Sequence, residues 1–249
     1  MKKPSVHFIS LGCSKNLVDS EKLMKQFSAS GFKVFFDTKA DVAPIVVINT
    51  CGFIGDAKQE SIDMILSYCD LKDQGKIKEI YVMGCLSERY RKELQEEIPE
   101  VDGYYGKFDH NLLLEKLNKK YNSLLCNERV LTTPKHYAYL KIAEGCNRAC
   151  SYCAIPIITG PYKSRTIEDI EDEVKYLVKN GVKEFQVIAQ DLSFYGLDNY
   201  KRLALPELIK RLSDIKGVEW LRLHYAYPTQ FPYEILDVIK ERENVCNYL

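Results

Sequence analysis

The sequence has little of what marks a membrane-bound, secreted or nucleic-acid-binding protein. No apolar run approaches the roughly 18 residues of a membrane span, and residues 1–4 lead straight into an expected strand without a signal-peptide core. Lys plus Arg and Asp plus Glu both number 35, so the charge balance gives no electrostatic case for binding nucleic acid or a membrane surface. We therefore expect a cytoplasmic monomer that binds neither a membrane nor DNA.

Repeats and histidines are scarce too. The chain has no internal repeat and no low-complexity segment, and its four histidines fit structural or exposed positions better than catalytic ones. It does have nine cysteines, an odd number that a complete set of disulfides would not use up. Because cytoplasmic thiols are rarely paired, metal ligation or redox chemistry explains them better.

The first half of the chain predicts an α/β domain. Hydrophobic residues make up 46 % and charged residues 28 %, as in a soluble globular protein of one large or two ordinary domains. Short apolar runs alternate with segments of helical periodicity. The expected strands are 6–11, 45–48, 80–83 and 103–106, and the clearest helices are 56–71, 88–98 and 112–121. This order is typical of a doubly wound, mostly parallel sheet, which we assign to residues 1–122.

The second half repeats the alternation but stops early. We expect the polar segment 123–136 to be a linker, and a helix to begin at the capping sequence Thr166-x-x-Asp169. The expected strands are 137–143, 184–189 and 220–226, the later helices are 205–215 and 233–241, and 244–249 resembles the start of one more strand. Three βα units cannot close a barrel, and a terminal strand leaves an unpaired edge. We therefore expect 137–249 to be a partial barrel, truncated from a longer protein.

Three cysteines near the start of the second half have the spacing of a metal site. Cys146, Cys150 and Cys153 have three residues and then two between them. Thiolates suit iron–sulfur clusters or zinc, and a four-iron cluster held by the protein alone needs four of them. Three would leave one iron open, as a catalytic zinc site keeps one position open. Zinc would need a fourth ligand, and neither His136 nor His224 lies at a recognisable zinc spacing, so an iron–sulfur cluster is favoured.

A second set of cysteines is spread over the first half. Cys13, Cys51 and Cys85 each follow the end of an expected parallel strand. Such ends share one edge of a sheet, where ligands bind, so the three thiols could converge on one ion or cluster. The alternative is three buried small hydrophobes, as free cysteines often are, but three equivalent positions favour ligation. The remaining cysteines are assigned no role: Cys69, Cys126 and Cys246.

The later cysteine run, placed after the first strand of a βα series, resembles the signature of the radical S-adenosylmethionine (SAM) superfamily. In that superfamily the open iron of a four-iron, four-sulfur (4Fe–4S) cluster binds the amino and carboxylate groups of SAM. The resemblance implies that the three cysteines are catalytic cluster ligands and that Tyr152 packs near the adenine. It also implies that Gln190 and Asp191, which end the second expected strand of the barrel, contact SAM.

Motifs in the first half are similar to those of the methylthiotransferase family within this superfamily. The matching stretches are 11–21 (LGCSKNLVDSE) and 49–54 (NTCGFI), with further matches at 154–156, 164–170, 189–196 and 221–228. The branch they resemble adds a methylthio group to the β-carbon of an aspartate of ribosomal protein uS12. The tRNA-modifying branch usually has Gly-Cys-Gln-Met-Asn in the first motif, where this chain has Gly-Cys-Ser-Lys-Asn.

The resemblance implies a transferase with two 4Fe–4S clusters. The first would cleave SAM to a 5′-deoxyadenosyl radical, with an electron donor such as flavodoxin or ferredoxin, to take a hydrogen from the unactivated β-carbon. Cys13, Cys51 and Cys85 would hold the second cluster, whose open iron could carry the sulfur. Family members continue through the rest of the barrel and a C-terminal TRAM domain, both absent here, so the resemblance does not imply activity for this chain alone.

Two other functions fit the residues. A tRNA methylthiotransferase would perform the same chemistry on adenosine, but it should have a basic face, which the neutral charge balance does not support. A non-catalytic zinc-binding or scaffold fragment would use the same thiols without SAM. Metal and sulfide content distinguishes this last function from the other two.

Overall fold

The computed structural model describes residues 3–38 and 43–249, and the chain divides into two compact units, Met1–Val130 and Leu131–Leu249. Of the N-terminal segment expected to lead into the first strand, residues 1–2 lie outside the described part. No helix in the described part is long and apolar enough to cross a membrane. The division falls within segment 123–136, whose role as a linker stays a prediction, as do the domain bounds 1–122 and 137–249.

The first unit is built on a five-stranded parallel sheet. Its strands are β1 (Ser5–Ser10), β2 (Lys33–Phe36), β3 (Ile45–Thr50), β4 (Glu79–Gly84) and β5 (Gly103–Tyr104). Their spatial order is β2-β1-β3-β4-β5, so the direction of the crossovers reverses between β1 and β3. In such sheets, ligands bind outside the carboxyl ends of the strands at this switch point.

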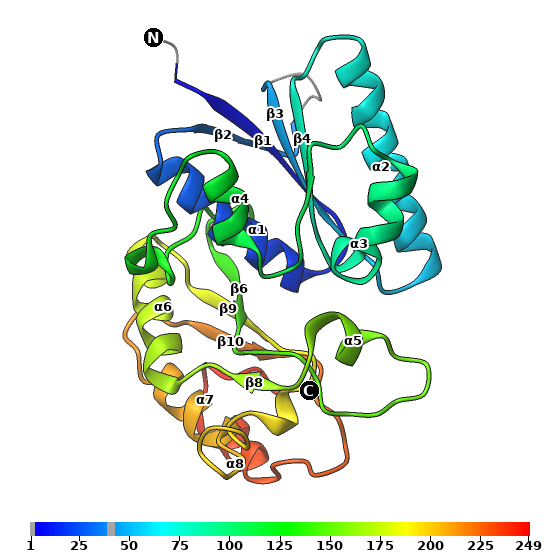
Figure 1. Ribbon diagram of the computed structural model, residues 1–249. Helices are drawn as coiled ribbons and strands as arrows, with labels where there is room; N and C mark the ends of the chain where they lie inside the picture. Colours follow the sequence, from blue (N-terminus) through cyan, green and yellow to red (C-terminus); the bar gives the residue numbers. More distant parts are fainter. Residues whose placement is uncertain (1–2, 39–42) are drawn as a thin grey trace. The chain divides into compact units, whose positions relative to one another are not determined.

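Helices cover both faces of this sheet, because its central strands are apolar on both sides. They are α1 (Ser14–Ala29), α2 (Gly55–Asp73), α3 (Cys85–Glu97) and α4 (His110–Lys116). In Figure 1, α1 and α4 lie on one side of the sheet and α2 and α3 on the other. One core contains Phe8 and Phe27, and the other contains Ile48 and Ile65. The predicted doubly wound parallel sheet is confirmed.

Two details of the first unit differ from the sequence-based expectation. The sequence does not predict β2, because this edge strand has no fully buried residue and no clean apolar pattern. Helix α3 begins at Cys85, three residues before the predicted start at 88, because Gly84, with a φ of 98°, turns the chain directly from β4 into the helix. The Cys85 side chain therefore projects from the first turn of a helix.

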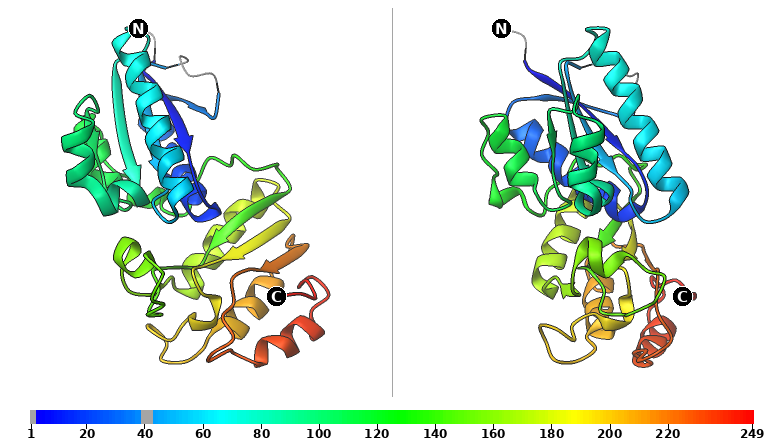
Figure 2. Two further views of the ribbon diagram at one scale, coloured as in Figure 1. Left: turned by 90° about the vertical axis from the view of Figure 1, so that its right-hand side faces the viewer. Right: turned by 45° about the vertical axis from the view of Figure 1, so that its right-hand side comes forward.

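The second unit has a three-stranded parallel sheet. Its strands are β6 (Tyr137–Lys141), β9 (Glu184–Ile188) and β10 (Trp220–Leu223), in the spatial order β10-β9-β6. Helices α6 (Ile167–Lys179), α7 (Leu205–Ser213) and α8 (Glu234–Glu241) pack against it around one apolar core, and Figure 2 shows them in two further views. Thr166 caps α6 as predicted, by accepting a hydrogen bond from the backbone N–H of Asp169.

These three βα units confirm the predicted partial barrel. Where one more strand was expected, Val245 makes a single parallel bridge to Leu221 of β10. A short antiparallel pair, β7 (Ala143–Glu144) and β8 (Lys163–Ser164), and helix α5 (Ile155–Thr159) follow β6. The sequence predicts none of these three, since elements of two to five residues show no clear periodicity. The stretch 145–154 between β7 and α5 has no regular secondary structure and carries the later cysteines.

Candidate metal and cofactor sites

The first set of cysteines follows three adjacent strands at the carboxyl edge of the sheet. Thr50 of β3 pairs with Gly84 of β4, so the next residues, Cys51 and Cys85, leave the sheet side by side. Cys13 follows β1, the other neighbour of β3, at the N-terminus of α1. We call these three cysteines the strand-end triad.

A buried asparagine connects the turns that carry this triad. The Asn16 side chain is 1 % exposed and donates hydrogen bonds to the carbonyl oxygens of Leu11 and Thr50, at 3.2 and 2.9 Å. Its Oδ1 accepts a hydrogen bond from the Sγ of Cys85 at 3.4 Å. Asn49 in turn donates to the backbone carbonyl of Asn16 at 3.0 Å. The sequence does not predict this role of Asn16, because Thr50 and Cys85, at the ends of β3 and β4, lie far from Asn16 along the chain.

Two glycines allow the same turns to approach one another. Gly12 has a φ of +86°, and a Cβ at this position would lie 2.7 Å from the Cβ and 2.9 Å from the Sγ of Cys51. A Cβ at Gly52 would lie 2.8 Å from the carbonyl oxygen of Cys85. A side chain at either position would push apart two segments that carry triad cysteines.

The surroundings of the strand-end triad disfavour free thiolates. Burial raises the pKa of Cys51 and raises that of Cys85 to about 12, and the nearby thiol of Cys13 raises both further. The cation of Lys107, which lies 3.0 Å from the carboxylate of Asp19, opposes the shift of the Cys85 pKa. A bound metal would have to supply the positive charge that keeps these ligands deprotonated.

The second set, Cys146, Cys150 and Cys153, lies within the 145–154 loop, and we call it the loop triad. Gly145 opens this loop with a φ of +70°, and a Cβ there would lie 2.1 Å from the carbonyl oxygen of Pro161. The backbone N–H of Cys146 donates a hydrogen bond to the carbonyl oxygen of Gly160, before β8, at 3.2 Å. The three thiols are free and partly exposed, and burial raises the pKa of Cys146. The loop therefore offers three accessible thiols from one short segment.

The three residues expected to contact SAM differ in their surroundings. Tyr152 is 86 % exposed, and Gln190 is partly buried just after β9. Asp191 is 2 % exposed, accepts a hydrogen bond from the backbone N–H of Ser193 at 2.9 Å and forms an ion pair with Arg148 at 2.8 Å. The structure thus brings Asp191 to the loop triad and leaves Tyr152 at the surface. That these residues contact SAM stays a prediction.

Cavities adjoin the loop triad. One of about 400 Å³ includes Cys150 and Arg148 in its lining, together with Phe194 and Tyr227. A second, of about 270 Å³, shares Phe194 with it. Within residues 3–38 and 43–249, no three His, Cys, Asp or Glu side chains are grouped closely enough to hold a single metal ion.

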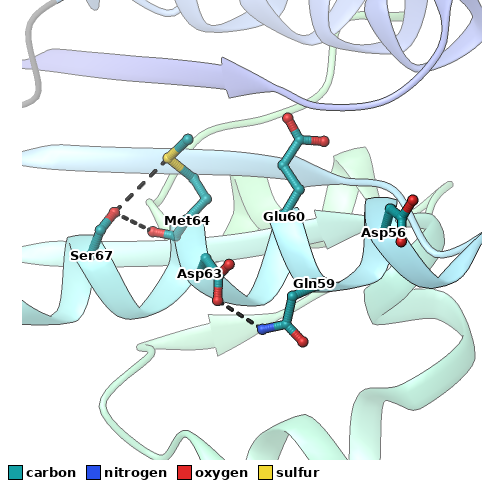
Figure 3. Close-up of a pocket in the computed structure, with 6 residues that line it drawn as sticks. All are labelled: Asp56, Gln59, Glu60, Asp63, Met64 and Ser67. Carbon is teal, nitrogen blue, oxygen red and sulfur yellow. Dashed lines mark hydrogen bonds between the residues drawn. The ribbon is translucent and has the colours of Figure 1, made fainter.

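A larger hollow, of about 570 Å³, runs along α2 and is shown in Figure 3. Its lining is mostly acidic or amide side chains, among them Asp56, Glu60 and Asp63. Gln59 donates a hydrogen bond to Asp63 at 2.8 Å, and no cysteine lines the hollow. We assign it no part in either triad.

Comparison with protein families divides the chain as the structure does. Residues 5–106 match an uncharacterized protein family, UPF0004, and residues 140–249 match the radical SAM superfamily. The loop triad lies within the residues that match the radical SAM superfamily, and the strand-end triad lies within those that match UPF0004.

Relatives narrow the resemblance. The chain is 61 % identical over 249 residues to the ribosomal protein uS12 methylthiotransferase RimO of Parabacteroides distasonis, and 62 % identical to that of Phocaeicola vulgatus. Each match covers the whole chain and 58 % of the relative. The RimO of Cytophaga hutchinsonii is 50 % identical over 248 residues. The predicted resemblance to this branch of radical SAM proteins is confirmed, and the chain spans slightly more than half the length of these relatives.

Solved structures share the fold at low sequence identity. The radical SAM methyltransferase TsrM of Kitasatospora setae, solved with a tryptophan substrate and a SAM analogue, matches with a TM-score of 0.63 and 14 % identity, over 96 % of this chain and 57 % of TsrM. The cobalamin-dependent radical SAM enzyme OxsB matches with a TM-score of 0.59 and 12 % identity, over 96 % of this chain and 42 % of OxsB. At these identities the likeness concerns the fold alone.

Proposed function

We propose that this chain carries the two cluster sites of a radical SAM methylthiotransferase that modifies an aspartate of ribosomal protein uS12. The observation that supports the proposal most strongly is the presence of two triads of free cysteines, each beyond the carboxyl ends of parallel strands. The 61–62 % identity to RimO proteins supports ribosomal protein uS12 as the substrate. Flavodoxin or ferredoxin as electron donor, and the monomeric state, stay predictions.

The residues of the loop triad fit a 4Fe–4S cluster with one open iron. Three thiols of soft character lie in one loop, partly exposed, beside a cavity of about 400 Å³. Gly145 lets the loop pass the backbone of Pro161, and the backbone N–H of Arg148 points to the Sγ of Cys146 at 3.4 Å. When bound, the cluster and SAM would supply the radical chemistry that a C–H bond without useful acidity requires.

The strand-end triad fits a second cluster, and this part of the proposal rests on packing. Its turns are held together by Asn16 and by the close approach of Gly12 to Cys51. Because burial raises the pKa values of Cys51 and Cys85, a cluster bound there would have to stabilise their thiolates. A site separate from the first would let one triad serve SAM cleavage while the other presents the sulfur that replaces one C–H bond by a C–S bond.

The test is mass spectrometry of uS12 and of tRNA nucleosides from cells in which the protein is deleted or restored, together with metal and sulfide analysis of the anaerobically purified chain. We expect uS12 to gain one methylthio group on an aspartate when the protein is restored, and tRNA nucleosides to stay unchanged. Cys150→Ala should abolish the product, whereas Cys69→Ala, a buried cysteine outside both triads, should not. Methylthioadenosine with unmodified uS12 would instead support the tRNA enzyme. Stoichiometric zinc without sulfide would support the non-catalytic fragment.

A further inference from the structure

The loop triad has an arginine between its first two ligands, and this side chain points back toward the sheet. The Nε of Arg148 donates to the Oδ2 of Asp191 at 2.8 Å, and its Nη2 donates to the carbonyl oxygen of Thr229 at 2.7 Å. Asp191 follows β9, and Thr229 lies in the segment that follows β10. One side chain from the ligand loop thus reaches segments that follow two different strands.

The ion pair is largely removed from water. The side chains of Arg148 and Asp191 are 13 % and 3 % exposed. Burying a carboxylate is costly unless a partner compensates its charge, and removal of one partner leaves the other buried and uncompensated. The pair therefore constrains the loop much more than an exposed ion pair would.

Two aromatic rings also lie against the Arg148 guanidinium. The Cζ of Arg148 lies 4.2 Å from the ring centre of Phe194 and 3.9 Å from that of Tyr227. A flat guanidinium can stack on rings and donate hydrogen bonds in its own plane at the same time, whereas a lysine ammonium cannot. The surroundings are thus specific for arginine and not only for positive charge.

The carboxylate of Asp191 accepts its hydrogen bonds from groups of the protein itself. Its Oδ1 accepts hydrogen bonds from the backbone N–H groups of Ser193, at 2.9 Å, and Tyr227, at 3.3 Å, while its Oδ2 accepts from Arg148. The hydroxyl of Tyr162 donates to the Asp191 backbone carbonyl at 2.8 Å. Three of the roughly four acceptor sites of a carboxylate are therefore in use, in a side chain that is almost fully buried.

We propose that Arg148 is a positioning residue that fastens the ligand loop to the segments after β9 and β10, and that Asp191 acts through Arg148 and not by contact with SAM. This assignment deepens the proposed function. Of the two tests below, only the measurement of iron loss depends on the proposed function being correct. Without the contacts of Arg148 with Asp191 and Thr229, the irregular 145–154 loop would open more often. Its cysteines would then release a bound cluster sooner.

The first test needs no metal. Tyr152 is 86 % exposed, so chymotrypsin cleavage after Tyr152 in the metal-free chain reports how often the loop opens. We expect Arg148→Lys, Arg148→Met and Asp191→Asn each to raise the rate of appearance of fragment 1–152 about tenfold. The double variant Arg148→Lys/Asp191→Asn should be no faster than either single variant, because both remove the same contact.

The matched control is Arg211→Lys, which alters an arginine paired with Glu171 on the surface of the same unit. It should cleave at the wild-type rate. Circular dichroism identifies any variant that does not fold, and Arg148→Lys, which keeps the charge, is the mildest change. Unchanged cleavage in every Arg148 and Asp191 variant that folds would overturn the proposal.

The second test uses the reconstituted chain and a chelator. The same variants should lose iron from the loop triad about tenfold faster, while SAM affinity per bound cluster stays at the wild-type value. If Asp191→Asn weakens SAM binding but leaves cleavage and iron loss unchanged, Asp191 is a SAM contact and the proposal is wrong. If the wild-type chain binds no iron, the proposed function fails, and the cleavage rates still decide the role of Arg148.

Discussion

The strand-end triad and the loop triad each provide three thiols, but the two sets are positioned in different ways. Cys13, Cys51 and Cys85 come from three segments and are brought together by strand pairing and a buried amide. The loop triad comes from eight consecutive residues, and its loop is held by the Arg148 ion pair and by hydrogen bonds at Cys146 and Asn147. A dispersed site depends on its whole sheet, whereas a contiguous site depends on a few local contacts.

This contrast also sets how the two sites should fail. Disruption of the first sheet should separate the ligands of the strand-end triad, since no local segment keeps them together. The cysteines of the loop triad stay close together along the chain in any conformation. Loss of local contacts should therefore change how the three thiols are oriented and how long they hold a cluster. The following predictions test this difference, from the largest expected effect to the smallest.

Shortening a core side chain should give the largest difference in iron loss between the two triads. Phe8 is fully buried in β1, with its ring 5.2 Å from that of Phe27. We expect Phe8→Ala to cost about 3–5 kcal/mol of unfolding free energy and to release the iron of the strand-end triad only. Phe185→Ala, at a fully buried position in β9, is the matched change in the second unit and should spare that iron. Denaturant titration with iron analysis measures both, and equal iron loss in the two variants would refute the contrast.

Two glycines with similar backbone conformations separate the effect of a steric clash with Cys51 from the effect of backbone strain. Gly12 and Gly31 have φ values of +86° and +91°, but only a Cβ at Gly12 meets Cys51, while nothing lies within 4 Å of one at Gly31. Alanine at either position should cost about 1–2 kcal/mol through strain. Gly12→Ala should also remove about half of the bound iron, as measured after reconstitution. If Gly31→Ala loses as much, strain and not the contact with Cys51 is responsible.

Loss of the buried amide should weaken the same triad more gently. Asn16→Leu leaves two carbonyl oxygens without their donor, which costs about 1–3 kcal/mol. We expect faster iron release to a chelator from the strand-end triad alone. The control is Asn244→Leu in the second unit, which also removes two hydrogen bonds to carbonyl oxygens. The role of Asn16 would be wrong if both variants released iron equally fast.

Part of the loss of stability at alkaline pH should come from a residue outside both triads, Tyr68. Burial raises the pKa of Tyr68 to about 12, with a smaller contribution from Asp37. The folded state therefore favours the neutral phenol, and this stability is present below about pH 10 and is lost as the pH rises toward 12. Tyr68→Phe should flatten the fall in unfolding free energy over that range, by an amount on the order of 2 kcal/mol, and leave iron content unchanged. An unchanged pH slope would contradict this.

The sequence predicts those features that depend on local pattern. Buried apolar runs such as 45–48 and 80–83 predict the strands of the parallel sheet, and the cysteine spacing alone indicates a cluster motif. The sequence does not predict the contacts of Arg148, because its partners Asp191 and Thr229 lie 43 and 81 positions after it along the chain. The network of Asn16 is hidden for the same reason. Contacts of this kind exist only after the strands have paired.

The most direct test of the two-site account is the iron and acid-labile sulfide content of the anaerobically reconstituted chain. We expect about eight irons per chain, with about four left in Cys85→Ala and about four in Cys150→Ala. Cys69→Ala should keep all eight. Four irons in the wild-type chain that survive in Cys85→Ala, or zinc without sulfide, would contradict the claim that each triad holds its own cluster.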